Sequence, residues 1–126
     1  MKLKYVLTSE LNGQKDDVVQ TDFVDFFEDN STEFTHIEFT DEKVMNCVLD
    51  VKNDEVKISY AAQKMHMRKN EFINNKLMIS ETDFIPIDVY LIDVKISMEE
   101  ISFTYDLLQN KKIIIRNTAK LIFSNN

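Results

Sequence analysis

The chain has 126 residues, of which 44% are apolar and 29% charged. This balance is typical of one globular domain and is too apolar for a disordered chain. Its 22 acidic residues outnumber the 15 basic ones, so the net charge is −7, and the basic residues are scattered. Nucleic acids and anionic membranes both select a clustered positive surface, so we expect neither as a partner.

The beginning of the chain, from Met1 to Thr8, alternates polar and apolar residues and lacks the continuous apolar run of a signal peptide. The longest apolar stretches span only a few residues, which is too short for a membrane-spanning helix. Cys47 is the single cysteine and has no basic neighbour, so we expect a buried structural thiol. These features predict a cytoplasmic protein with one domain over residues 1–126.

Strand-like runs alternate with short turn signals along the whole chain. The first turn is predicted at Asn12-Gly13, because both residues accept the positive φ angles of a tight hairpin turn. The next segment, 21–29, carries apolar residues on both faces. A strand buried on both sides, a strand with a bulge, or a short helix over 22–28 would each produce that pattern. Residues 33–40 return to alternation, with Thr35, Ile37 and Phe39 on one face.

The middle of the chain predicts two more hairpins. A two-residue turn at Asn53-Asp54 brings the apolar residues of both flanking strands to one face. The predicted cross-strand pairs are Val51–Val56, Leu49–Ile58 and Cys47–Tyr60. A turn at Asn74-Asn75 would pair charges instead, and the predicted pairs are Arg68–Glu81 and His66–Asp83. Pro86, the only proline, is assigned to a join outside the strands.

The last third of the chain predicts a further pair of hairpins. A turn at Glu99-Glu100 gives the pairs Met98–Ile101, Ile96–Phe103 and Val94–Tyr105. A three-residue loop over 109–111 gives the pairs Leu107–Ile113, Tyr105–Ile115 and Phe103–Asn117. In both cases the apolar residues fall on one continuous face.

Turn signals at this spacing predict an all-β, antiparallel fold of roughly eight to ten strands. An up-and-down barrel is favoured because closure leaves no exposed sheet edge, and a β-sandwich is the alternative.

Three segments resemble the YwiB-like family of small bacterial proteins, a domain of unknown function. They are residues 64–70, residues 80–85, and the closing hairpin of residues 101–107 and 117–121. Thr82 and Phe84 keep the family's Thr-Pro-Tyr-Gly signature in part, whereas Asp83 and Ile85 replace its proline and glycine. The resemblance implies a calycin-like, lipocalin-like β-barrel. The family has no established activity, so the resemblance implies no catalytic residues.

Residues that could support catalysis or bind a metal are few. His36 and Glu38 share one strand face near Glu33, but a metal site needs three or four converging ligands, so we interpret this face as solvated. His66 is assigned to its pairing with Asp83. With Gly13 as the only glycine, no phosphate-binding loop can form. We therefore predict no enzymatic activity and no cofactor.

A methionine- and aromatic-rich face is the best candidate for ligand binding, because flexible thioethers beside rings adapt to apolar molecules. Tyr60, Tyr105 and Asn117 would supply polar anchors on that face. The sequence thus predicts binding of a small apolar or amphipathic ligand, and the alternative is a protein-interaction or structural module with a filled core. For the alternative, the candidate surface is the aromatic segment 23–27 with Phe34. The predicted ligand-lining residues are Tyr60, Met65, Met67, Met78, Phe84, Tyr90, Phe103, Tyr105 and Asn117.

Overall fold

The computed structural model describes residues 1–124, which form strands, turns and loops and no helix. The fold is therefore all-β, as predicted. The strands are β1 (Lys2–Leu11), β2 (Gln14–Gln20), β3 (Phe26–Asp29), β4 (Thr35–Thr40), β5 (Asn46–Lys52), β6 (Glu55–Tyr60), β7 (Gln63–Arg68), β8 (Phe72–Met78), β9 (Phe84–Ile96), β10 (Glu100–Gln109) and β11 (Lys112–Ser124).

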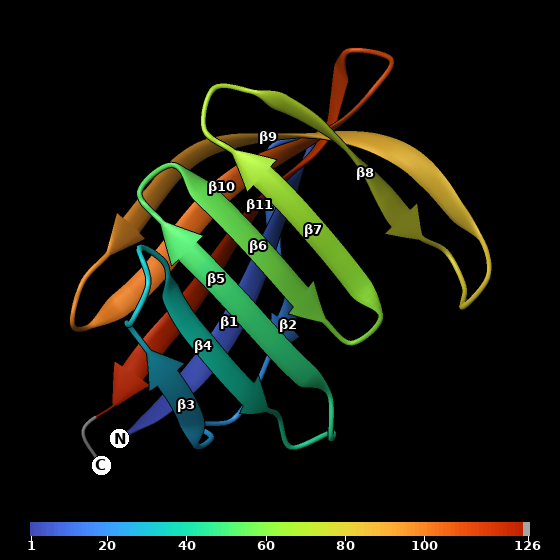
Figure 1. The fold of residues 1–126 in the computed structure, drawn as a ribbon. Helices are drawn as coiled ribbons and strands as arrows, with labels where there is room; N and C mark the ends of the chain where they lie inside the picture. Colours follow the sequence, from blue (N-terminus) through green and yellow to red (C-terminus); the bar gives the residue numbers. More distant parts are fainter. Residues whose placement is uncertain (125–126) are drawn as a thin grey trace.

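The strands form two antiparallel sheets that face each other (Figure 1). The larger sheet has the order β2-β1-β11-β10-β9-β8, and the smaller has the order β3-β4-β5-β6-β7. Alternate residues of each strand point into the space between the sheets, where they form one core. The arrangement is therefore that of a β-sandwich, the alternative that the sequence left open.

The expected barrel is not closed by a main-chain ladder among residues 1–124. On one side, the chain after β2 stays beside β1, with Leu3 and Val24 exchanging hydrogen bonds of 2.9 and 2.8 Å, and then enters β3 of the other sheet. On the opposite side, side-chain amides join β7 to β8. Gln63 bonds to the main chain of β8 at Lys76 and Met78, and Asn75 bonds to both main-chain groups of His66.

Two of the predicted hairpins are confirmed. Asn12 and Gly13 have φ angles of 53° and 80° and join β1 to β2. The turn at Asn53-Asp54 gives the three predicted pairs of β5 with β6. Cys47 lies in the core with 1% of its surface exposed, and burial raises the pKa of its thiol to about 12, which confirms a buried structural thiol.

The predicted turn at Asn74-Asn75 is wrong, because both residues lie inside β8. The chain reverses instead at Asn70, which has a φ of 65°, and in the loop over 79–83. Consequently Arg68 lies opposite Glu55, and His66 lies opposite Lys57. The sequence pattern could not reveal this, since the amide of Asn75 is used across the gap between two sheets rather than in a turn.

Pro86 was also misplaced, since it lies within β9 opposite Lys76 of β8. The pairing of β9 with β10 ends at Asp88, so at Pro86 one edge of β9 has no neighbouring strand. A proline is tolerated there because no ladder bond is required of its nitrogen on that side.

The two C-terminal hairpins have the predicted inner face for most residues but the wrong partners, and Met98 and Ile113, which were predicted on that face, are 93% and 57% exposed. Ser97 caps a longer turn, so Ile96 pairs with Ile101 and Val94 with Phe103. The last turn has two residues, Asn110 and Lys111, both with positive φ. An extra residue at Ile114 then restores the alternation. The observed pairs are Leu107–Ile115, Tyr105–Asn117 and Phe103–Ala119.

Segment 21–29 forms no helix. It runs extended beside β1 and then as β3, and Phe26 packs against the core while Phe23 and Phe27 are 44% and 57% exposed. Residues 35–40 form β4 with Ile37 and Phe39 buried, as the alternation predicted.

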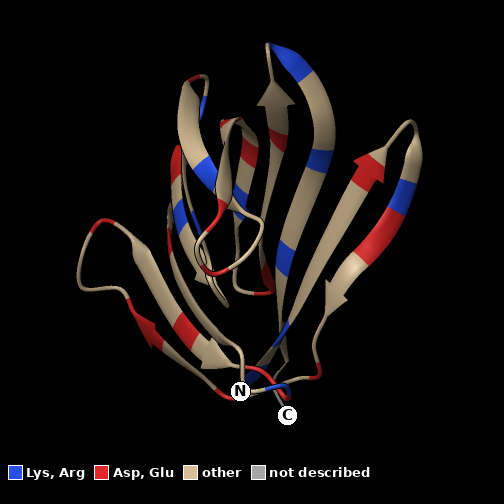
Figure 2. Cartoon of the chain, turned by 90° about the vertical axis from the view of Figure 1, so that its right-hand side faces the viewer, with Lys and Arg blue, Asp and Glu red and all other residues tan. Residues whose placement is uncertain are grey.

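Acidic and basic bands are interspersed along the strands of both sheets (Figure 2). Within residues 1–124 there is no helix long and apolar enough to cross a membrane.

Candidate functional site

Three of the four tyrosines gather between the sheets. Tyr5 comes from β1, Tyr60 from the end of β6 and Tyr105 from β10. The ring of Tyr60 lies 5.2 Å from that of Tyr5, measured between centroids. Tyr5 and Tyr105 are 3% and 5% exposed, so both are enclosed by the core. The sequence singled out Tyr60 and Tyr105 as polar anchors, and the structure brings Tyr5 to join them.

The register of β11 explains how Tyr5 and Tyr105 approach each other. Tyr5 lies opposite Leu121 and Tyr105 opposite Asn117, on the two sides of β11. Ala119 occupies the inner position of β11 between those two partners and is fully buried.

The hydroxyl groups of this cluster are only partly hydrogen bonded. The Asn117 amide donates to the Tyr105 oxygen at 3.4 Å, and the Ser9 hydroxyl donates to the Asn117 amide oxygen at 2.6 Å. Neither Tyr5 nor Tyr105 donates its own hydroxyl hydrogen to an acceptor within residues 1–124. Burial raises the pKa of both side chains, and Tyr105, Cys47 and Tyr60 raise that of Tyr5 further, so both hydroxyls stay protonated.

Tyr60 differs from Tyr5 and Tyr105 because its hydroxyl donates a hydrogen bond to the Asp41 carboxylate. The other oxygen of Asp41 accepts the main-chain N–H groups of Lys43 and Met45 at 2.8 and 2.9 Å. Burial opposes ionisation of Asp41, but the hydrogen bonds from Tyr60 and these N–H groups lower its pKa overall. Burial and the Asp41 carboxylate raise the pKa of Tyr60. The entrance to the cluster therefore holds a fixed carboxylate and a neutral phenol.

A pocket of about 240 Å³ lies at this end of the sandwich. Thr21 forms part of its wall and also accepts the main-chain N–H of Tyr5 at 2.9 Å, which ties the pocket wall to the tyrosine cluster. We call this region the tyrosine end. The pocket is lined by Val18, Val19, Gln20, Thr21, Asp41, Glu42, Lys43, Met45, Tyr60 and Ala61.

The remaining predicted ligand-lining residues do not share one face. Met65, Met67 and Phe103 are buried in the core between the sheets. Met78, Phe84 and Tyr90 occupy the opposite face of the β8–β9 hairpin from the buried Ile87, Val89 and Leu91. Tyr90 stacks there on the exposed ring of Phe72, with centroids 4.7 Å apart. The predicted common face is wrong for these three because the wrong turn at residues 74–75 reversed their orientation.

A second, more apolar pocket of about 450 Å³ is lined by Met1, Glu28, Thr35, Ile96, Ser97, Met98, Ile101 and Phe123. Ser97 is already engaged in the β9–β10 turn, where its hydroxyl donates to the Glu100 carbonyl at 3.0 Å. Nothing in the sequence pattern had marked this pocket.

The histidines lie on the outer face of the smaller sheet. His36 lies between Asp50 and Glu38, and its ring nitrogens are 2.6 and 2.8 Å from their carboxylate oxygens. The hydrogen bond with Glu38 is the largest cause of the raised pKa of His36, and the hydrogen bond with Asp50 adds to it. His66 contacts Glu55 at 2.6 Å, so the predicted pairing with Asp83 is wrong. No group of three or more acidic, histidine or cysteine side chains within residues 1–124 is arranged to hold a metal ion.

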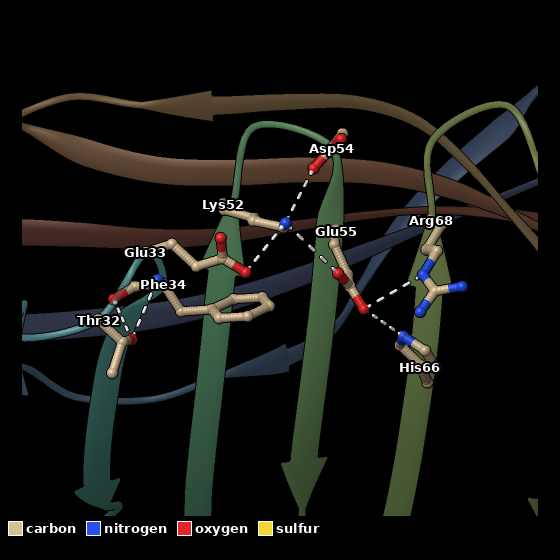
Figure 3. Close-up of polar contacts among 8 residues, drawn as sticks. All are labelled: Thr32, Glu33, Phe34, Lys52, Asp54, Glu55, His66 and Arg68. Atoms are coloured by element: carbon tan, nitrogen blue, oxygen red, sulfur yellow. Dashed lines mark hydrogen bonds and ion pairs between the residues drawn. The ribbon is translucent and has the colours of Figure 1, made fainter.

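Glu55 is the centre of the second of these networks (Figure 3). Its carboxylate is only 11% exposed and contacts Lys52, His66 and Arg68 within 4 Å. The hydrogen bond from His66, with that from Arg68, lowers the pKa of Glu55 although burial opposes this. Lys52 also lies 5.2 Å from the ring centroid of Phe34. Every cation of this network is paired, so its chemistry is that of cross-strand stabilisation.

Sequence reasoning missed Tyr5, although the signal was present. Leu3, Tyr5 and Leu7 are alternate residues of one apolar-rich run, and alternation in a strand places all three on the inner face of β1. What the pattern lacked was the pairing of β1 with β11, two strands at opposite ends of the chain.

Comparison with known proteins supports the fold. No family model matches this chain, and no curated protein is similar to it in sequence. The crystal structure of the ywiB protein from Bacillus subtilis superposes with a TM-score of 0.69, over 98% of this chain and 91% of that one. The two sequences are 11% identical, so the likeness concerns the fold alone: this chain has a YwiB-like fold.

Proposed function

We propose that this protein binds a small amphipathic molecule at the tyrosine end, with no covalent chemistry. The observation that carries the proposal is the convergence of Tyr5, Tyr60 and Tyr105 between the sheets, beside a pocket of about 240 Å³. Ligand sites typically combine an apolar lining with a few convergent polar groups.

One feature of the cluster supports binding over simple core filling. Tyr5 is only 3% exposed, yet its hydroxyl has no hydrogen-bond partner within residues 1–124 and is not sealed within packed carbon. A bound molecule with a hydrogen-bond acceptor would use that donor.

The proposal is tested by intrinsic fluorescence and thermal unfolding. The chain has no tryptophan and four tyrosines, of which three lie at the site, so tyrosine emission reports binding directly. Native mass spectrometry of gently purified protein, followed by a screen of small neutral amphiphiles, should identify a ligand. At a ligand concentration 100 times Kd, the stabilisation is about 2.7 kcal/mol, which raises Tm by on the order of 10 °C.

A Met45→Asp variant should weaken this response, because Met45 lines the pocket and aspartate replaces its apolar side chain by a charge. An Ile79→Asp variant is the matched control, since Ile79 is also exposed but does not line this pocket. If no small molecule is retained and no amphiphile changes the tyrosine emission of the wild-type protein, the proposed function is wrong.

A second candidate function is protein interaction through the aromatic segment 23–27. Phe23 and Phe27 are exposed and, with Phe26, line a shallow depression beside β4. Static light scattering across a concentration series tests this idea, with Phe27→Ser as the variant. A constant monomer mass, together with unchanged behaviour of the variant, would leave this candidate without support.

A further inference from the structure

We infer that the pocket of about 450 Å³ between the β9–β10 turn and strands β3 and β4 binds a small apolar amine, whose ammonium group pairs with the Glu28 carboxylate. The turn and these two strands lie at the same side of the sandwich (Figure 1). No residue lines both this pocket and the pocket of the tyrosine end, so the site is a second one and goes beyond the proposed function.

Glu28 occupies a core-facing position of β3. It comes two residues after Phe26, whose ring lies 5.4 Å from that of Phe123 between centroids, and it pairs with the fully buried Ile37 of β4. Residues two apart in a strand share a face, and so do residues directly opposite each other in an antiparallel pair. The chain thus places a carboxylate on the inner face of an edge strand, where it lines the pocket.

The larger sheet supplies the apolar part of the pocket. Ile101 is buried and Phe123 adds an aromatic ring, whereas Ile96 and Met98 leave 40% and 93% of their surface exposed. An apolar ligand body that covers Ile96 and Met98 removes this surface from water, and the flexible thioether of Met98 can adapt to its shape. The pocket therefore combines an apolar wall with one negative charge.

The Glu28 carboxylate has no cationic partner among residues 1–124. It accepts a hydrogen bond from the Asn30 amide at 2.6 Å, and no ammonium, guanidinium or imidazole nitrogen of these residues lies within 4 Å of it. Glu38 and Glu55, by contrast, each contact a histidine on the outer face of the smaller sheet. A cation is also favoured by the net charge of −7, which repels anionic ligands. Charge and lining together select a ligand that joins a positive charge to an apolar body.

Three compounds that share one ring and differ in charge test the inference: cyclohexylmethylamine, cyclohexylmethanol and cyclohexanecarboxylate. Each is titrated at about pH 7 and low salt into the full chain, labelled with carbon-13 on its methionine methyl groups, and followed by NMR. Met98 lines this pocket and Met45 lines that of the tyrosine end, so the methyl signals show which pocket a compound enters. The amine should shift the Met98 signal and bind about fivefold more tightly than the alcohol. The carboxylate should leave that signal unchanged.

A Glu28→Gln variant should lose the preference for the amine and keep the affinity for the alcohol, because glutamine has the same size and no charge. Glu81→Gln is the matched control, since it makes the same change in net charge at an exposed residue that lines neither pocket. Its affinity for the amine should equal that of the unsubstituted protein. Raising the salt concentration should weaken binding of the amine and not of the alcohol, and this measurement needs no variant.

An unchanged Met98 signal with all three compounds overturns the inference, as does binding of the alcohol or the carboxylate at least as tight as that of the amine. A shift of the Met45 signal alone places the compound at the tyrosine end, which overturns this inference and supports the proposed function. Undiminished binding of the amine by Glu28→Gln means that the carboxylate only protects the edge of β3 from pairing with another strand, and it overturns the inference. Equal weakening by Glu81→Gln assigns the attraction to the whole molecule and overturns it as well.

Discussion

At the scale of single residues, the backbone angle of Val44 is the most unusual feature of the molecule. Val44 has a φ of 63° in the loop between β4 and β5, a conformation that is strongly disfavoured for a β-branched side chain. The loop imposes it, because the Val44 N–H donates to the Asp41 carbonyl at 3.0 Å while the Asp41 carboxylate holds the flanking N–H groups. The side chain itself is 78% exposed and contributes little packing.

Replacing Val44 by glycine should therefore raise the free energy of unfolding by about 0.5–1 kcal/mol, because glycine adopts positive φ without strain. Urea denaturation measures this. Val18→Gly is the matched control, since Val18 is also exposed but lies in the extended strand β2. There the same substitution should lower stability by about 0.5–1 kcal/mol. A loss of stability in both variants would show that Val44 is not strained.

At the scale of secondary-structure elements, the contact between β7 and β8 depends on side chains. Asn75 accepts the N–H of His66 and donates to the carbonyls of His66 and Ile73, at 2.9, 2.9 and 3.1 Å. One amide group thereby takes the place of a peptide unit at the edge of β7. An Asn75→Leu variant keeps the side-chain volume but leaves these main-chain groups unpaired.

We expect Asn75→Leu to lower the free energy of unfolding by about 1–3 kcal/mol and to speed hydrogen exchange at the His66 amide. Asn74→Leu is the control, because Asn74 is exposed on the other face of β8 and its side chain, within residues 1–124, hydrogen bonds only to Asp88, at 3.2 Å. Its effect should stay within about 0.5 kcal/mol. Equal effects of the two substitutions would indicate that the amide bridge does not hold the sheets together.

At the scale of the whole molecule, two carboxylates with lowered pKa values and one histidine with a raised pKa set how the free energy of unfolding depends on pH. Glu55 and Asp41 have pKa values below their ordinary 4.5 and 3.8, so their stabilisation is complete above those values and is lost as the pH falls further. The pKa of His36 lies above its ordinary 6.5, so its stabilisation is complete below pH 6.5 and is lost as the pH rises through the folded-state value. Stability should thus be greatest between about pH 5 and 6.

Urea denaturation at about pH 3.5, 5.5 and 8.5 checks this profile. A His36→Gln variant should lose the decline on the alkaline side and keep the decline on the acidic side, because glutamine does not titrate. Glu55→Gln should shrink the acidic decline instead. If the alkaline decline persists unchanged in His36→Gln, the bridge to Glu38 and Asp50 contributes nothing to stability.

Local pattern explains which parts of the fold could be predicted. The all-β class, the turns at residues 12–13 and 53–54 and the inner faces of most strands depend on neighbouring residues alone. The prediction of a turn at residues 74–75 was wrong because two successive asparagines favour a turn locally, whereas in the structure the Asn75 side chain hydrogen bonds to the other sheet. The predicted pairing of β9, β10 and β11 was wrong in register because bulges with one extra residue shift the partners along the strand.

The residues of the candidate site likewise fall into those that the sequence pattern identified and those that only the structure revealed. Tyr60, Tyr105 and Asn117 were found as polar residues on an apolar face, and Tyr5 was not, because its neighbours in space come from β11 and the facing sheet. The sequence by itself determined an acidic all-β domain with alternating strands, since side-chain alternation and turn chemistry act over a few residues. Only the tertiary structure decided that the sheets remain open between β7 and β8, and that three tyrosines meet at one end, because these contacts join residues distant in sequence.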